Sequence, residues 1–198
     1  YWNIYYSATF DSYNILPDSG FVMLPESYAR QKIKKYGCTI HSATGILNWM
    51  GRLKGSISDT YNEIWNNSNV ELHDNGGEDW LYGGAYLEDV KNYFNSYFAS
   101  LGIKTRAFID SDVTFDEVVR HIGSNYSGEK APFSMSIWVE GDDGHTITVI
   151  SYLKTSSKNY VVIYNGWWLD ENDCQVDENG IKANVNNNTS YLSVRYID

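Results

Sequence analysis

The chain has 198 residues and a mass of 22.6 kDa, which suits a single domain, since typical domains contain roughly 100–200 residues. Hydrophobic residues make up 42% of the sequence and charged residues 20%, so a sizeable core can form and disorder of the whole chain is excluded. The formal net charge of −10 repels phosphate groups and argues against binding of DNA or RNA. No apolar run approaches the ~20 residues of a membrane-spanning helix, so we expect no membrane span.

The first half of the chain carries mostly helical patterns. Residues 1–10 are aromatic and precede a loop, which predicts an extended lead-in or an edge strand. In residues 42–50, apolar side chains recur at i, i+3, i+4 and i+7, as in a helix buried on one face, and Gly51 ends the pattern. A short helix is expected over 58–66, followed by an Asn/Gly-rich loop.

The clearest helix covers residues 83–101, where large apolar side chains recur at helical spacing and Gly102 stands at the C-terminal cap position. A strand is predicted over 103–109. Thr114 and Glu117 then form a capping box in front of a helix that ends near residue 122.

The last third of the chain carries strand patterns separated by turn residues. Helices that precede hairpin-connected strands favour an α+β fold with an antiparallel sheet. We therefore expect one domain over 1–198, with a helical lobe at about 31–122 and a sheet lobe at about 133–197. The four predicted strands of this lobe are 133–140, 145–153, 160–165 and 191–197.

Cys38 is the first residue that could carry chemistry. It follows Gly37 and directly precedes the predicted helix. At that position the positive end of the helix dipole would stabilise a thiolate. The competing interpretation is a small hydrophobic residue at a helix start, which is the commoner role of a cysteine taken alone.

His145 opens an apolar strand, and Asn165 ends the strand that follows it. If the two strands are antiparallel neighbours, the imidazole and the amide lie side by side. An amide oxygen beside an imidazole fixes its orientation and tautomer. Taken alone, His145 could be a structural histidine and Asn165 a turn residue.

Gln31 precedes Cys38 by seven residues. Its amide could fold over the sulfur and, with the backbone N–H of Cys38, bind a developing oxyanion. This signal is the weakest of the four, because exposed glutamines are common.

The order of these residues resembles that of the papain-like cysteine peptidases, and within that clan it is most similar to the bacterial families related to bacteriocin leader-processing (double-glycine) peptidases. The matching segments are QKIKKYGCTIHSATGILNWMG, GHTITVISYL and YVVIYNGWW, so the resemblance covers roughly residues 31–168. It implies a papain-like two-lobe fold. It also implies that Cys38 is the nucleophile, His145 the general base and acid, Asn165 the orienting residue and Gln31 the oxyanion donor.

Other candidate residues have simpler explanations. His41 lies three residues after Cys38 and could approach the sulfur, but packing beside the cleft is the simpler reading. Cys174 lies in an acidic stretch that disfavours a thiolate, so we expect it to be inert. His121, inside a predicted helix, carries no special signal. His73 and nearby acidic residues lack the ligand spacing of a metal site and are expected to form a solvated loop.

The sequence therefore predicts a cysteine peptidase or amidase that cleaves a peptide or amide bond through an acyl-enzyme, without a metal or organic cofactor. The expected partner is a peptide or protein substrate, and the expected location is the exterior or cell surface of a bacterium. Two alternatives stay open: a non-catalytic papain-like module that binds peptide or cell-wall material, and a related acyl transferase.

Overall fold

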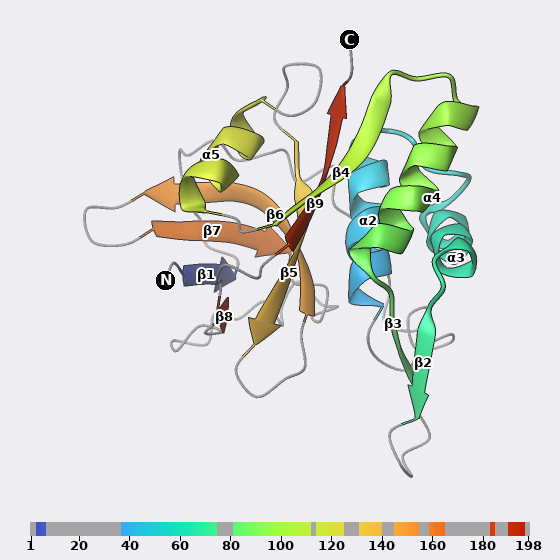
Figure 1. Ribbon diagram of the computed structural model, residues 1–198, viewed down its shortest axis with the longest axis horizontal. Coiled ribbons are helices and arrows are strands. Elements are labelled where there is room, and N and C mark those ends of the chain that lie inside the picture. Colours follow the sequence, from blue (N-terminus) through green and yellow to red (C-terminus); the bar gives the residue numbers. More distant parts are fainter. Residues whose placement is uncertain are drawn as a thin grey trace.

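The computed structural model describes residues 3–6, 37–74, 81–111, 114–124, 131–139, 145–154, 159–164, 183–184 and 190–196. Within this part of the chain, helices pack on both faces of a largely antiparallel sheet, so the protein belongs to the α+β class (Figure 1). None of the described helices is long and apolar enough to cross a membrane. The helices are α2 (Cys38–Trp49), α3 (Ile57–Asn67), α4 (Leu87–Ser100) and α5 (Phe115–Ser124).

The large sheet has the strand order β1-β7-β6-β5-β9-β4, with a short strand, β8, paired to β5. Neighbouring strands are antiparallel except at β1, which runs parallel to β7 at one edge. A separate hairpin joins β2 (Glu71–Asp74) to β3 (Leu81–Gly84). The strands of the large sheet are β1 (Asn3–Tyr6), β4 (Thr105–Ser111), β5 (Phe133–Val139), β6 (His145–Lys154), β7 (Asn159–Tyr164), β8 (Ala183–Asn184) and β9 (Ser190–Tyr196).

Most predicted elements are confirmed, and three differences follow from strand pairing. Residues 71–74, which we expected to form a solvated loop around His73, form strand β2 and pair with β3. The helix predicted from residue 83 begins at Leu87, because residues 81–84 pair with β2. The strand β4, which we assigned to the helical lobe, pairs with β9 along its whole length and belongs to the large sheet. Helices and sheet are therefore less segregated along the chain than the sequence pattern suggests.

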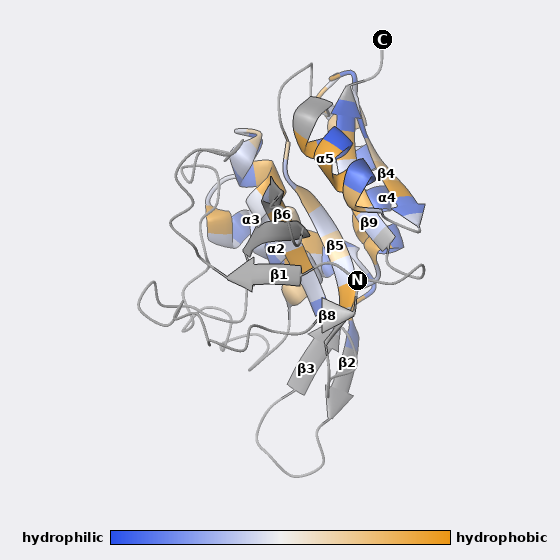
Figure 2. Ribbon diagram, turned by 90° about the vertical axis from the view of Figure 1, so that its left-hand side faces the viewer, coloured by the Kyte–Doolittle hydropathy of each residue, from blue (hydrophilic) through white to orange (hydrophobic). Residues whose placement is uncertain are grey.

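Two apolar cores lie on opposite faces of the sheet. Strand β9 serves both: Tyr191 packs with α5, whereas Leu192 and Val194 pack with α2, α3 and α4. Successive side chains of a strand point to opposite faces, so this alternation is what a sheet covered on both sides requires. In Figure 2, α4 and α5 both carry hydrophobic residues together with hydrophilic ones, as expected for helices that cover a sheet with one face.

Helix α2 lies at the centre of the larger core. Of the nine residues from Thr39 to Leu47, all but His41 are buried. We predicted a helix buried on one face. The structure buries α2 on more than one face, because the helix contacts α3, α4, β5 and β6. In the first two turns of the helix, only Cys38 and His41 are partly exposed.

Candidate active site

The starts of α2 and β6 lie against each other, and Cys38 and His145 are the first residues of these elements. No side chain caps the N-terminus of α2, where Gly37 occupies the cap position. The first backbone N–H groups of a helix have no partner within the helix and carry the positive end of its dipole. The sulfur of Cys38 therefore lies in a locally electropositive environment.

Three groups lie within reach of the sulfur of Cys38 and act on it as hydrogen-bonding partners: the side chain of His145, the backbone of Thr146 and the side chain of Thr39. Burial raises the pKa of the Cys38 thiol, but these hydrogen bonds and the charge of His145 outweigh burial, so the net pKa is lowered. A thiol with a lowered pKa that remains partly exposed is the form in which a cysteine is reactive.

Behind the sulfur, hydroxyl side chains fill the contact between α2 and the sheet. On the helix-facing side of β5 and β6, Ser134 pairs with Thr148 in register, and Ser42 of α2 hydrogen-bonds to both, at 2.7 and 2.6 Å. We call these three residues the Ser42 triad. Each of them is at most 3% exposed, so the hydroxyls supply one another's hydrogen-bond partners inside a buried interface.

A second hydroxyl set lies one step closer to the sulfur. Ser136 and Thr146 are register partners whose hydroxyl oxygens are 3.4 Å apart, and Thr39 meets Thr146 at 2.9 Å between hydroxyl oxygens. We call Thr39, Thr146 and Ser136 the Thr39 triad. Together the two triads join the polar side of β5 and β6 to α2, and only the Thr39 triad reaches the residue next to Cys38.

Sequence reasoning overlooked both triads, although the pattern is visible. Residues 133–137 and 146–149 each alternate a polar residue with an apolar one through Ser134, Ser136, Thr146 and Thr148. Such alternation ordinarily marks a solvent-facing side of a strand. Here the polar side faces a buried helix that carries matching hydroxyls.

His41 is closer to the site than we expected. It is half-buried one turn after Cys38 on the same side of α2, and residues three apart on a helix are neighbours. Burial and the positive charge of nearby His145 lower the pKa of His41 to about 4. His41 is therefore neutral near pH 7 and adds no positive charge beside the sulfur.

Two of the four predicted site residues, Gln31 and Asn165, lie outside the described residues, as does Cys174. The antiparallel pairing of the two strands that we predicted is present as far as Tyr164, the residue before Asn165. Strands β6 and β7 are antiparallel, and Tyr164, the last residue of β7, pairs with Thr148. Of the four predicted site residues, Cys38 and His145 are therefore the two that the structure describes, and it brings them together.

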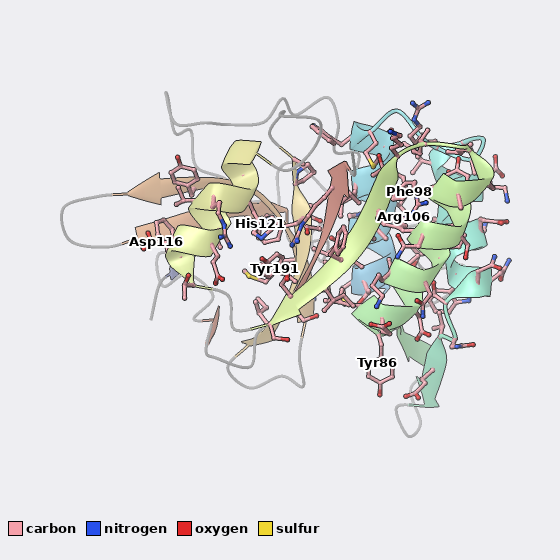
Figure 3. The ribbon with its side chains drawn as sticks, turned by 45° about the horizontal axis from the view of Figure 1, so that its top comes forward. Tyr86, Phe98, Arg106, Asp116, His121 and Tyr191 are labelled. Atoms are coloured by element: carbon pink, nitrogen blue, oxygen red, sulfur yellow. The ribbon has the colours of Figure 1, made fainter. Side chains whose placement is uncertain are left out.

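A second buried histidine lies on the other face of the sheet. His121 of α5 and Tyr191 of β9 point toward each other and are joined by a hydrogen bond between Nε2 and the phenol oxygen (Figure 3). Burial, reinforced by the carboxylate of Asp110, raises the pKa of Tyr191 to about 12. A phenol held protonated in this way is a structural hydrogen-bonding group, not an activated nucleophile.

No group of three His, Cys, Asp or Glu side chains among the described residues is arranged to hold a metal ion. The chemistry that the described site offers is that of a thiolate and an imidazole. A comparison of the chain with models of protein families, with curated proteins and with solved structures finds no match.

Proposed function

We propose that the protein is a papain-like cysteine peptidase or amidase in which Cys38 is the nucleophile and His145 the general base and acid. The observation that carries this proposal is the juxtaposition of Cys38, at the N-terminus of α2, with His145, at the start of β6, which brings the imidazole within reach of the sulfur. A nucleophile and a base within hydrogen-bonding reach are the minimum that covalent catalysis of acyl transfer needs.

The first chemical step forms an acyl-enzyme. His145 takes the proton of Cys38, and the thiolate attacks the carbonyl carbon of a peptide or amide bond. The backbone N–H of Cys38, together with the side chain of Gln31, stabilises the oxyanion. The imidazolium of His145 then protonates the nitrogen as the C–N bond breaks, leaving a thioester on Cys38 and releasing an amine.

The second step returns the free enzyme. His145 removes a proton from water, the hydroxide attacks the thioester carbon, and the carboxylic acid product leaves as the sulfur regains its proton from His145. In this scheme Asn165 orients the imidazole. Its position directly after Tyr164 in the sequence supports that role, because the last residue of β7 pairs with Thr148, near the start of β6.

The α+β architecture supports the papain-like assignment in outline. A helix that begins with the cysteine packs against a sheet whose strand begins with the histidine, so the two elements contribute one reactive residue each. The family resemblance of the sequence predicts the same pair in the same order.

The test is site-specific labelling followed by a turnover assay. Iodoacetamide and an epoxide peptide inhibitor should modify Cys38 far faster than Cys174 at pH 6, as shown by peptide mapping, and Cys38→Ala should abolish the fast reaction. Cys174→Ala is the matched control and should leave it unchanged. Slow and equal labelling of the two cysteines would favour a non-catalytic binding module.

Turnover separates the remaining alternatives. The wild-type protein should release new amino termini from a mixed peptide library, and Cys38→Ala should release none. Addition of a primary amine, such as glycine amide, distinguishes hydrolysis from transfer, because a transferase would convert most of the acyl-enzyme to the amide product.

A further inference from the structure

The Thr39 triad lies beside Cys38 and offers the thiolate a hydrogen-bonding partner in addition to His145. Thr39 follows Cys38 directly and is 5% exposed, and its hydroxyl contacts both the Cys38 sulfur and the hydroxyl of Thr146. A hydroxyl has one proton to donate. If Thr39 gives that proton to the sulfur, Thr146 must donate to Thr39.

The same logic extends one residue further into the sheet. With the proton of Thr146 directed at Thr39, the remaining contact of Thr146, to Ser136 at 3.4 Å, is one in which Ser136 donates. The result is a chain of hydroxyls that all point toward the sulfur. Hydrogen bonds in such a chain polarise one another, and a negative charge at its end strengthens each of them.

We propose that Thr39 is a catalytic residue that donates a hydrogen bond to the Cys38 thiolate and is itself polarised by Thr146 and Ser136. The role rests on the proposed function, since a stabilised thiolate matters for a nucleophile. Thr39 keeps its proton throughout, whereas the proton of the thiol is transferred to His145. The donor acts in the resting enzyme, and its bond weakens once the sulfur carries the acyl group.

The Ser42 triad supplies the comparison that makes the role testable. It lies on the same helix and the same two strands, it has shorter hydrogen bonds, and it makes no contact with the sulfur. Loss of a hydroxyl from either triad disturbs the α2–sheet interface. Only loss of the Thr39 hydroxyl removes a donor from the thiolate.

The experiment measures the thiol pKa of Cys38 from the pH dependence of iodoacetamide alkylation, in a Cys174→Ser background. Thr39→Val should raise that pKa by about one unit and so slow alkylation at pH 6 about tenfold. Thr39→Ser, which keeps the hydroxyl, should restore it. Thr146→Val should shift the pKa in the same direction by less, because it removes only the polarising neighbour.

Ser42→Ala should leave the thiol pKa unchanged even if it lowers the melting temperature as much as Thr39→Val does. Equal pKa shifts in Thr39→Val and Ser42→Ala, or no shift in Thr39→Val while the wild type keeps a low thiol pKa, would overturn the role of Thr39 alone. An ordinary thiol pKa in the wild type would instead overturn the proposed function.

Discussion

His145 and Cys38 open the strand and the helix that carry them, and their side chains meet in a hydrogen bond. A second contact joins the starts of α2 and β6, because the hydroxyl oxygens of the next residues, Thr39 and Thr146, are 2.9 Å apart. The reactive pair is thus held by backbone elements and not by loops, which gives its geometry the rigidity of the sheet.

His145→Ala should raise the pKa of the Cys38 thiol. The change removes both the hydrogen bond and the positive charge that lower this pKa, while burial, which raises it, remains. Alkylation by iodoacetamide at pH 6 should slow by about tenfold or more, since one unit of pKa is a factor of ten in thiolate below the pKa.

The matched control for that experiment is His121→Ala. His121 is also a buried histidine, but it packs against Tyr191 and Phe133 in the other core. Its loss should lower stability and leave the alkylation profile of Cys38 in place. A shifted profile in His121→Ala would show that alkylation reports general loosening of the fold.

His41→Gln should flatten the dependence of stability on pH. The pKa of His41 is about 4 in the folded protein, against an ordinary value near 6.5. Between pH 6.5 and pH 4, His41 is protonated in the unfolded chain but stays neutral in the folded protein. The wild type therefore loses stability as the pH falls, by about 2 kcal/mol at pH 4.5. Glutamine cannot titrate, and the variant keeps that part of its stability.

Urea unfolding of both proteins at pH 7 and pH 4.5 measures the effect. The carboxylates titrate alike in the two proteins, so the difference between their pH profiles isolates His41. Because the charge of His145 helps to lower the pKa of His41, His145→Ala should also reduce the pH range over which the wild type loses stability through His41. Parallel profiles for wild type and His41→Gln would show that His41 titrates normally in the folded protein.

Local signals made much of the fold predictable from the sequence. The capping box of Thr114 and Glu117 is present, with the N–H of Thr114 donating to Oε2 of Glu117 at 2.7 Å. The strand starting at His145 and the turn at Gly102, where φ is +65°, also agree with the prediction. Each of these features depends on residues close together in the chain, so short sequence patterns carry them.

The features that were missed depend on long-range packing. Residues 105–111 carry an ordinary strand pattern, which does not predict their pairing with β9, whose residues lie 79 to 91 positions later in the chain. The same holds for Ser42 and Thr39, whose hydroxyls have meaning only once the polar side of β5 and β6 is set against them. Cys38 and His145 could be paired in advance because the order of the candidate residues along the whole chain, and not a local pattern, related them.

Tyr191→Phe should cost about 1–2 kcal/mol of the free energy of unfolding, because it removes the hydroxyl that bonds to buried Nε2 of His121. The matched control is Tyr93→Phe. The hydroxyl of Tyr93 is buried and has no hydrogen-bond partner among the described residues. Its removal should be neutral or slightly stabilising.

A double-mutant cycle tests the same contact more directly. His121→Leu should cost less in the Tyr191→Phe background than in the wild type, with a coupling of about 0.5–3 kcal/mol, as expected for residues in contact. Chemical denaturation of the four proteins gives the value. Additive effects would mean that the two side chains contribute separately to the core between α5 and the sheet.

Asn95→Ala should expose the outer edge of the sheet. Strand β4 ends the described sheet order, and Asn95 of α4 places its amide against that edge. The Oδ1 atom accepts from the N–H of Ala107 at 2.8 Å, and Nδ2 donates to the carbonyl of Ala107 at 3.2 Å. The side chain thereby copies the two bonds of a neighbouring strand and blocks pairing with another chain.

Loss of both bonds should reduce the free energy of unfolding by about 1–2 kcal/mol and increase concentration-dependent association, measured by denaturation and light scattering. Asn67→Ala is the control, because the Asn67 amide bonds only to the carbonyl of Glu63 at an exposed helix end. It should change stability by less than about 0.5 kcal/mol. Asn95 bonds to Ala107 and is not among the groups that act on the Cys38 thiol, so thiol reactivity should be unchanged. Equal effects of the two substitutions on association would show that Asn95 does not protect the edge.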